Sequence, residues 1–428
     1  MIRKLKVVTL GCSKNSVDTE HLLASLPEGM YEPAGEDGRA DVMLLNTCGF
    51  IGDAKQESIE AILEAVEGRK AGLVGKLGVF GCLSQRYAAE LRSEIPEVDA
   101  WFGARDLAPV LEWLGVDAAG LDLSRRLPEQ RGYAYLKISE GCDRRCSYCA
   151  IPFIRGPHRS VPIESLVREA EALARSGVRE LILIAQDTTY YGLDLYGKRS
   201  LARLAQALSG IEGIEWIRIH YSYPADFPED LLDLMASNPK MCRYIDIPLQ
   251  HISDAVLSKM HRSVNSAQTR ALVAKMRERV PGVVLRTTMI TGHPGEGEKE
   301  FGELLDFVRE ARFERLGAFP YSEEEGTYGA EHFEDSVPEE EKRRRYDRLM
   351  EVQQDISLAF NSSRVGTEEK VIVDDILDGS LVCRSQYESP DVDGEIIVRH
   401  PGGGLKVGDF VKVRIVSADD YDLEAELV

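Results

Sequence analysis

Short apolar runs alternate with amphipathic stretches over the first 115 residues of the chain. The runs have the length of buried strands, and the stretches between them have the apolar spacing of surface helices. Such alternation is typical of an open, mostly parallel α/β sheet. The predicted strands are 5–10, 41–46, 77–80 and 99–102, and the predicted helices are 16–26, 54–67, 85–93 and 107–114.

A second alternating series follows a stretch at 118–131 that loses the periodicity and collects glycine, proline and charged residues. We expect a first domain at 1–117, a linker at 118–131 and a second domain at 132–362. Six strand–helix units predict a partial (β/α)6 barrel, in which chemistry occurs at the C-terminal strand ends. The predicted strands are 133–138, 180–184, 216–220, 244–247, 283–289 and 315–319, and one long helix is expected at 163–176, with Gly177 as its cap.

A charged helix and a β-rich segment complete the chain. Ser336 and Glu339 have the spacing of a capping box at the helix start. The run at 339–345 has the composition of a basic patch, but its Glu–Arg pairs at i,i+4 favour a solvated helix face. Five short β-like runs then predict a small β-barrel at 363–428. These runs are 370–373, 381–384, 395–399, 410–416 and 421–427.

Charge and hydropathy restrict the class of protein. The chain of 428 residues has a net charge of −20, which disfavours a nucleic-acid backbone as main partner and favours a basic protein. The longest aliphatic run, 181–185, is far shorter than a transmembrane helix. The apolar run at 7–10 is also too short for a signal peptide. We therefore expect a cytoplasmic protein without a membrane span.

Three cysteines lie close together after the first strand of the second domain. Cys142, Cys146 and Cys149 form a CxxxCxxC run, which can hold three corners of a 4Fe-4S cluster and leave one iron open to a substrate. The alternative is structural zinc. A closed zinc site takes four ligands, and no further Cys or His pair is spaced nearby.

Three other cysteines are dispersed through the first domain, and each directly follows a predicted strand. Because the ends of parallel strands share one sheet edge, Cys12, Cys48 and Cys82 are expected to form a second cluster site. The alternative is that they are buried packing thiols, which are common. The flanking glycines favour the cluster, because they let the backbone approach a bulky cofactor. Cys242 and Cys383 have no such neighbours and are expected to be packing or surface thiols.

No nucleotide-binding motif accompanies these cysteines. The glycines at 292–297 do not match a Walker loop, and no GxGxxG opens a helix after a strand. His251 and His293 follow predicted strands and are placed to face the site. A lone histidine, however, is more often simply packed or hydrogen-bonded.

The CxxxCxxC run resembles the radical S-adenosylmethionine superfamily. With the N-terminal cysteine domain, the Ile-Pro-Phe-Ile-Arg-Gly segment at 151–156 and a final barrel of the TRAM type, the whole chain is similar to a methylthiotransferase. The resemblance implies a catalytic 4Fe-4S cluster on Cys142, Cys146 and Cys149, and a second on Cys12, Cys48 and Cys82. It also implies S-adenosylmethionine as radical source and methyl donor. The candidate contacts to S-adenosylmethionine are Tyr148, Arg155, Gln186, Gly292 and Glu296.

The family has two substrate branches, a tRNA adenosine and an aspartate β-carbon of small-subunit ribosomal protein uS12. The segments at 11–15, 185–192 and 321–327 resemble the ribosomal-protein branch, although Ser13 stands where that branch often has proline. Gln-Met-Asn and Gln-Asn-Val, typical of the tRNA branch, are absent from the corresponding positions. Residues 364–428 contain 15 acidic and 7 basic residues, which suits a basic protein better than RNA, although general acidity also explains it.

Breaking an unactivated C–H bond needs a radical cofactor, so the protein's task is positioning. We expect an electron donor such as flavodoxin or ferredoxin, uS12 as free protein or in the ribosome, and no nucleic acid as primary substrate. The alternatives are a tRNA adenosine methylthiotransferase and an iron–sulfur carrier or scaffold. The open corner of the CxxxCxxC cluster argues against a simple carrier, since carrier clusters are normally fully ligated.

Overall fold

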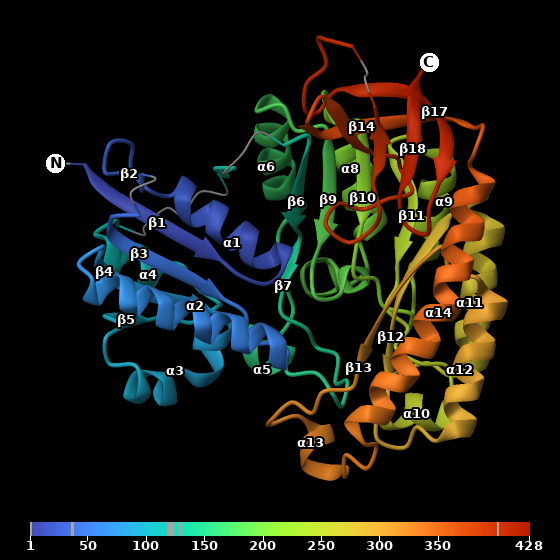
Figure 1. Ribbon diagram of the computed structural model, residues 1–428, viewed down its shortest axis with the longest axis horizontal. Coiled ribbons are helices and arrows are strands. Elements are labelled where there is room, and N and C mark those ends of the chain that lie inside the picture. Colours follow the sequence, from blue (N-terminus) through green and yellow to red (C-terminus); the bar gives the residue numbers. More distant parts are fainter. Residues whose placement is uncertain (1, 36–37, 118–123, 128–130, 400–401) are drawn as a thin grey trace. The chain divides into compact units, whose positions relative to one another are not determined.

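The protein forms two compact units in a computed structural model that describes residues 2–35, 38–117, 124–127, 131–399 and 402–428 (Figure 1). The first unit contains the N-terminal part of the chain to residue 128, together with the short segments 140–144 and 150–159. The second contains 129–139, 145–149 and everything from residue 160 onward. Most of the predicted linker, 118–123 and 128–130, lies outside the described residues, and the domain boundaries stay predictions.

The first unit is built on a five-stranded parallel sheet of order β2-β1-β3-β4-β5 (Figure 1). The order reverses between β1 and β3, which makes their C-terminal ends the usual binding edge of a doubly wound sheet. Helices α2 and α3 bury apolar side chains against one face, and α1 and α4 against the other. The strands are β1 (Arg3–Thr9), β2 (Tyr31–Pro33), β3 (Ala40–Thr47), β4 (Val74–Gly81) and β5 (Ala100–Trp101). The helices are α1 (Ser13–Ala24), α2 (Gly52–Lys70), α3 (Cys82–Glu94), α4 (Ala108–Leu114) and, after the CxxxCxxC run, α5 (Ile151–Arg155).

The second unit contains a six-stranded parallel sheet of order β13-β12-β11-β10-β9-β6, which confirms the six strands expected of a partial barrel. Because both faces are covered, strands such as β9 are buried at every residue. The strands are β6 (Tyr133–Lys137), β9 (Glu180–Ile184), β10 (Trp216–Ile219), β11 (Met241–Asp246), β12 (Val284–Thr291) and β13 (Arg315–Pro320). Two short strands, β7 (Ser139–Glu140) and β8 (Arg159–Ser160), lie where the chain passes between the units.

Helices separate the strands of this sheet. Helix α6 ends one residue before its predicted end, and Gly177 follows with φ of 103°, as its predicted capping role requires. The helices are α6 (Ile163–Arg175), α7 (Leu193–Tyr196), α8 (Leu201–Ser209), α9 (Glu229–Ser237), α10 (Asp254–Lys259), α11 (Ser266–Arg279), α12 (Glu298–Ala311), α13 (Tyr328–His332) and α14 (Glu339–Ser363), with a 3-10 turn η1 (Thr188–Tyr190).

The predicted capping box of α14 is wrong. The residue that caps the helix is Pro338, and no side chain caps its first turn. Arg345 does pair with Glu341 at 2.7 Å, so one of the predicted i,i+4 pairs is present. Three glutamates in the first turn favour the helix start electrostatically instead.

The C-terminal segment folds into a closed barrel of order β14-β15-β16-β18-β17, as the five β-like runs predict. Cys383 packs in the core of this barrel. Cys242 packs with Trp216, Tyr244 and Ile372, where β10 and β11 meet the barrel. The strands are β14 (Glu368–Leu377), β15 (Ser380–Arg384), β16 (Ile396–Val398), β17 (Phe410–Ala418) and β18 (Leu423–Leu427).

Buried charges join the barrel to the parallel sheet within the second unit. Glu180 accepts hydrogen bonds from Arg218 and from Arg384, each at 2.8 Å, and its side chain is fully buried. Arg384 also binds Asp374. Fully paired charges of this kind fix one arrangement of the elements that carry them, since separating them would leave a charge buried alone.

No helix in the described part of the chain is both long enough and apolar enough to cross a membrane.

Candidate functional site

Three cysteine-bearing loops meet at the C-terminal edge of the first unit's sheet. Cys12 follows β1, Cys48 follows β3, and Cys82 follows β4 as the first residue of α3. The strands are neighbours in the sheet, and the charges of Cys12 and Cys82 both act on Cys48. Thus the topology brings together three residues that are far apart in the sequence.

Burial and the charge of Arg155 shift the pKa values of these thiols in opposite directions. Burial raises the pKa of Cys48 to about 11, with smaller contributions in the same direction from Cys12 and Cys82, and the charge of Arg155 opposes the shift. Burial also raises the pKa of Cys82, again against Arg155. Cys12 and Cys82 both lie at helix N-termini, where the backbone N–H groups favour a thiolate. A metal cluster would replace the thiol protons, and Arg155 and the helix N–H groups would then stabilise the thiolates that bind it.

The loops leave no room for larger residues beside the cysteines. A Cβ atom on Gly11 would lie 2.6 Å from Cβ of Cys48, and one on Gly49 would lie 2.6 Å from the backbone of Leu83. Gly11 and Gly81 also have φ of 88° and 104°, the left-handed region that favours glycine. These glycines therefore allow the three cysteine-bearing loops to approach one another closely.

The donor set fits a multi-iron cluster better than one ion. Among the described residues, no three His, Cys, Asp or Glu side chains converge as one metal ion requires. In a 4Fe-4S cluster each thiolate binds a different iron, so its ligands stand farther apart than those of a single ion. Three thiols that follow neighbouring strands at one sheet edge are a donor set that such a cluster can use.

Arg155 lies in this same unit, at the end of α5. Its Nη2 donates to Oδ1 of Asn15 at 2.6 Å, and its Nη1 donates to Oδ2 of Asp18 at 2.8 Å. Asn15 and Asp18 belong to α1, directly after Cys12. Arg155 is therefore placed beside the three-cysteine loops, and its contact with S-adenosylmethionine stays a prediction.

The CxxxCxxC run is anchored through its backbone. In the first unit, the N–H of Cys142 donates to O of Gly156 at 3.0 Å. In the second unit, the N–H of Cys149 donates to O of Cys146 at 3.1 Å, and Ser147 bonds through its N–H to Met260 and through its carbonyl to Gly329. These bonds fix the loop without using its thiols.

Arg262 approaches Cys146 and was not indicated by the sequence. Its Nη1 lies 3.6 Å from Sγ of Cys146 and 3.5 Å from the hydroxyl of Tyr148. Nη2 donates to O of Pro248 at 2.7 Å, and the guanidinium lies 4.2 Å from the ring centroid of Tyr223. No motif surrounds Arg262, so only the fold shows that a cation stands beside this cysteine.

Glu296 holds the glycine loop after β12 from within the protein. Its Oε1 accepts from the N–H of Gly292 at 2.8 Å and from Nη1 of Arg345 at 2.9 Å. Its Oε2 lies 3.0 Å from Nε2 of His251. Because His251 Nδ1 accepts from the N–H of Ser253, Nε2 carries the proton and donates to Glu296. Glu296 and His251 thus fix the shape of the loop.

His293 is fully buried at the tip of this loop. Its Nδ1 donates to O of Pro294 at 3.0 Å, and its Nε2 has no hydrogen-bond partner among the described residues. Burial lowers the pKa of His293 to about 4, so the ring is neutral at pH 7. The rings of Tyr321 and Tyr148 lie at centroid distances of 5.0 and 6.4 Å. Gln186 is the second residue after β9, at the same C-terminal side of the sheet.

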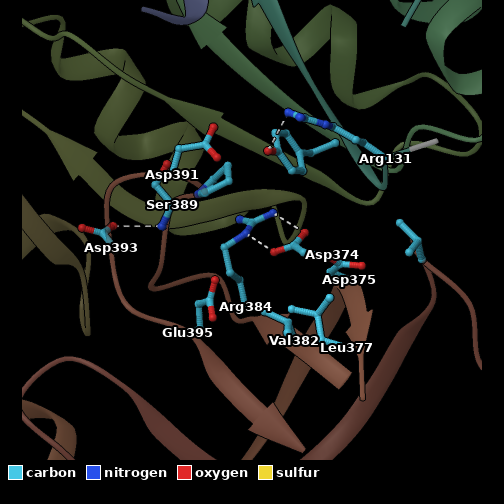
Figure 2. Close-up of a pocket in the computed structure, with 13 residues that line it drawn as sticks. Arg131, Asp374, Asp375, Leu377, Val382, Arg384, Ser389, Asp391, Asp393 and Glu395 are labelled. Atoms are coloured by element: carbon cyan, nitrogen blue, oxygen red, sulfur yellow. Dashed lines mark hydrogen bonds and ion pairs between the residues drawn. The ribbon is translucent and has the colours of Figure 1, made fainter. Parts of the chain in front are cut away.

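An acidic pocket of about 260 Å³ lies in the second unit, between the barrel and β6 (Figure 2). Five carboxylates and two guanidinium groups line it, which leaves an excess of negative charge. Burial, with the nearby Asp422, Asp374 and Asp375, raises the pKa of Glu395. The charged lining residues are Asp374, Asp375, Asp391, Asp393, Glu395, Arg131 and Arg384.

Comparisons with known proteins agree with this arrangement. The chain matches the radical SAM superfamily over residues 136–308, an uncharacterized family designated UPF0004 over 4–103 and the TRAM domain over 365–428. A ribosomal protein uS12 methylthiotransferase RimO of Porphyromonas gingivalis is 50% identical over 431 residues, which cover 99% of each chain. The chain belongs to the RimO family.

Other RimO proteins are similar over the same extent. Those of Bacteroides fragilis and Flavobacterium johnsoniae are 48% and 49% identical, covering 100% and 99% of this chain and 99% and 98% of theirs.

Solved structures share the fold at low sequence identity. The radical S-adenosylmethionine methyltransferase TsrM of Kitasatospora setae has a TM-score of 0.56 at 16% identity, covering 75% of this chain and 72% of TsrM. The cobalamin-dependent radical enzyme OxsB has a TM-score of 0.51 at 14% identity, covering 83% of this chain and 56% of OxsB. This likeness confirms the α/β architecture.

Proposed function

We propose that this protein transfers a methylthio group to the β-carbon of an aspartate in small-subunit ribosomal protein uS12. The observation that carries the proposal is the similarity of the entire chain to RimO proteins, at 50% identity to that of Porphyromonas gingivalis over 99% of both chains. The two sets of three cysteines support the same reaction, because one set can hold a radical-generating cluster and the other a second cluster.

The cysteines take two roles in this proposal. Cys142, Cys146 and Cys149 hold the 4Fe-4S cluster that binds S-adenosylmethionine, and Cys12, Cys48 and Cys82 hold the second 4Fe-4S cluster. When bound, the clusters and two molecules of S-adenosylmethionine supply an electron, a 5′-deoxyadenosyl radical, a methyl group and a site for sulfur. The residues of the chain bind and orient these groups and the substrate aspartate.

Side chains near the CxxxCxxC run orient S-adenosylmethionine in the proposal. Tyr148 and Gln186 provide polar groups at the C-terminal side of the sheet, and Gly292 brings backbone close to the same side. Glu296 acts through the loop, because both of its oxygens accept from protein donors. A rigid loop favours the productive geometry, because small displacements of the reacting atoms lower the reaction rate.

The acidic barrel supports a basic protein as substrate. Burial, and after it the charges of Asp422, Asp374 and Asp375, raises the pKa of Glu395, so a cationic side chain of the substrate would relieve the repulsion among these carboxylates. uS12 is proposed as free protein or within the ribosome, in the cytoplasm. A small electron-transfer protein such as flavodoxin or ferredoxin is proposed as reductant.

Mass spectrometry of small-subunit ribosomal proteins tests the proposal. We expect the methylthio mass on one aspartate of uS12 to disappear when the gene is deleted and to return with the wild-type chain. Cys146→Ala should fail to restore it, whereas Cys383→Ala, which changes a thiol packed in the barrel core, should succeed. Loss of methylthio from a tRNA nucleoside, with uS12 unchanged, would refute the substrate. Absence of S-adenosylmethionine cleavage by the reduced protein would indicate a carrier.

A further inference from the structure

Arg155 joins the segment after the CxxxCxxC run to the three-cysteine loops of the same unit. Helix α5 begins two residues after Cys149 and ends at Arg155, and its N-cap Ala150 and its Ile154 pack with Cys82. Arg155 is only 4% exposed, and its guanidinium reaches the start of α1. The helix that follows one cysteine set therefore covers a cysteine of the other.

A continuous chain of contacts leads from Arg155 to Cys82. Nη2 of Arg155 donates to Oδ1 of Asn15 at 2.6 Å, and Sγ of Cys82 lies 3.9 Å from that same oxygen. Nδ2 of Asn15 donates to O of Leu10 and, more weakly, to O of Thr47, the residues just before Gly11 and Cys48. Asn15 therefore ties together the three cysteine loops and presents its oxygen to Arg155.

Two carboxylates and a carbonyl oxygen lie against the guanidinium of Arg155. Oδ2 of Asp18 lies 2.8 Å from Nη1, and Oε2 of Glu140 lies 3.3 Å from it. O of Ala104 completes the set at 3.1 Å. Because the group is buried, its field reaches the nearby sulfurs with little screening by solvent.

We propose that Arg155 is a positioning residue of the second cluster site, which holds Asn15 against Cys82 and supplies the positive charge that stabilises the cluster's reduced state. This inference rests on the proposed function, because it assumes a cluster on Cys12, Cys48 and Cys82. A reduced cluster carries one more negative charge than an oxidised one. A buried cation beside its sulfurs therefore raises the reduction potential, and a buried anion lowers it.

Two substitutions move this potential in opposite directions. Arg155→Gln removes the cation and should make the midpoint potential of the second cluster more negative. Asp18→Asn removes one of the two anions beside the cation and should make the potential less negative. Arg155→Lys keeps the charge but loses the forked geometry, so its potential should lie between those of wild type and Arg155→Gln. Damage to packing alone would not give shifts of opposite sign.

The experiment uses the full chain with Cys142, Cys146 and Cys149 changed to alanine, so that only the second cluster is loaded. Iron per chain is measured first, and the midpoint potential is then measured by redox titration followed by EPR. Arg105→Gln is the matched control, because Arg105 also holds α5, donating to O of Phe153 and Ile154, but has no bond to Asn15 or Asp18. If Arg155→Gln loses the cluster, Arg155→Lys replaces it, because its potential should also be more negative than that of the wild type.

The outcomes separate this inference from the proposed function. Opposite shifts for Arg155→Gln and Asp18→Asn, with Arg105→Gln unchanged, support it. Unchanged potentials, shifts of the same sign, or an equal shift in Arg105→Gln overturn it and leave the cluster assignment standing. A parent chain that binds no iron overturns both the second cluster and the role of Arg155.

Discussion

Nη1 of Arg262 lies 3.6 Å from Sγ of Cys146, while Nη2 of the same residue is held at 2.7 Å by O of Pro248. The cation is thus fixed on one side and turned toward the cysteine on the other. Cys146 is the central cysteine of the CxxxCxxC run, so the charge of Arg262 acts at the middle of the loop.

Arg262→Gln should slow reductive cleavage of S-adenosylmethionine about tenfold or more, because a hydrogen bond to a charged group contributes roughly 1.5–3 kcal/mol. The initial rate of 5′-deoxyadenosine formation with excess reductant measures the effect. Arg270→Gln is the control, since Arg270 pairs with Glu310 on the surface of the same unit. Equal rates for wild type and Arg262→Gln would contradict the role of Arg262.

Gly11→Ala should abolish the second cluster and halve the iron bound per chain, since each of the two clusters holds about four irons. The new Cβ would lie 2.6 Å from Cβ of Cys48, and Gly11 has φ of 88°. Gly29→Ala separates crowding from backbone strain, because Gly29 has φ of 77° and nothing within 4 Å of the added Cβ. Iron analysis should show full loading for Gly29→Ala. Half loading of Gly29→Ala would mean that backbone strain, and not crowding by the added Cβ, causes the loss of iron.

Glu180→Gln should lower the free energy of unfolding of the second unit by roughly 3–5 kcal/mol, because it leaves buried guanidinium groups without their counter-charge. Glu215→Gln breaks an exposed pair with Lys370 and should cost less than about 1 kcal/mol. Urea unfolding of both variants gives the comparison. A small effect at Glu180 would show that Asp374 alone balances Arg384.

His293 makes stability depend on pH in the acid range. Its folded-state pKa is about 4, below the usual 6.5, so the unfolded chain binds the proton more tightly. Stability is therefore complete above pH 6.5 and falls as the pH is lowered from 6.5 to 4, by up to about 3 kcal/mol. Unfolding of the cluster-free chain at several pH values measures this slope. His293→Gln should flatten it, and an unchanged slope would place the titration elsewhere.

The acidic pocket should affect substrate binding more than catalysis. Asp375→Asn/Glu395→Gln removes two negative charges from its lining and should raise the KM for uS12 with little change in kcat. Asp347→Asn/Glu351→Gln makes the same change of net charge on the exposed side of α14 and serves as control. Equal effects of the two pairs would show that only overall charge matters.

The sequence predicts most of the fold because strands and helices here have clear periodicity. It misses β2 (Tyr31–Pro33), since three residues that include a proline give no alternating pattern. It also misplaces the start of α14 by assigning a cap to Ser336, because spacing alone does not show whether a side chain reaches the backbone. Local patterns thus locate elements but not their termini.

The candidate site is harder to predict from local sequence patterns than the fold is. The six cysteines are visible in the sequence because each cysteine stands after a predicted strand or within one short run. Arg262 is invisible there, since it is 116 residues from Cys146 and approaches it only after folding. Arg155 is visible, but its position next to the CxxxCxxC run suggests a different partner from the Asn15 and Asp18 that it contacts.

Helix α14 sets a fixed distance between two ends of the second unit. Near its start, Arg345 bonds to the side chain and carbonyl of Glu296, in the loop after β12. Near its end, Asn361 donates to O of Asp419 in the barrel at 2.9 Å. These anchors are separated by about 24 Å of helix. A polypeptide bound at the barrel can therefore present a residue to the strand ends only through an extended or projecting segment that covers this fixed length. The length of that segment thus becomes a criterion for selecting the substrate.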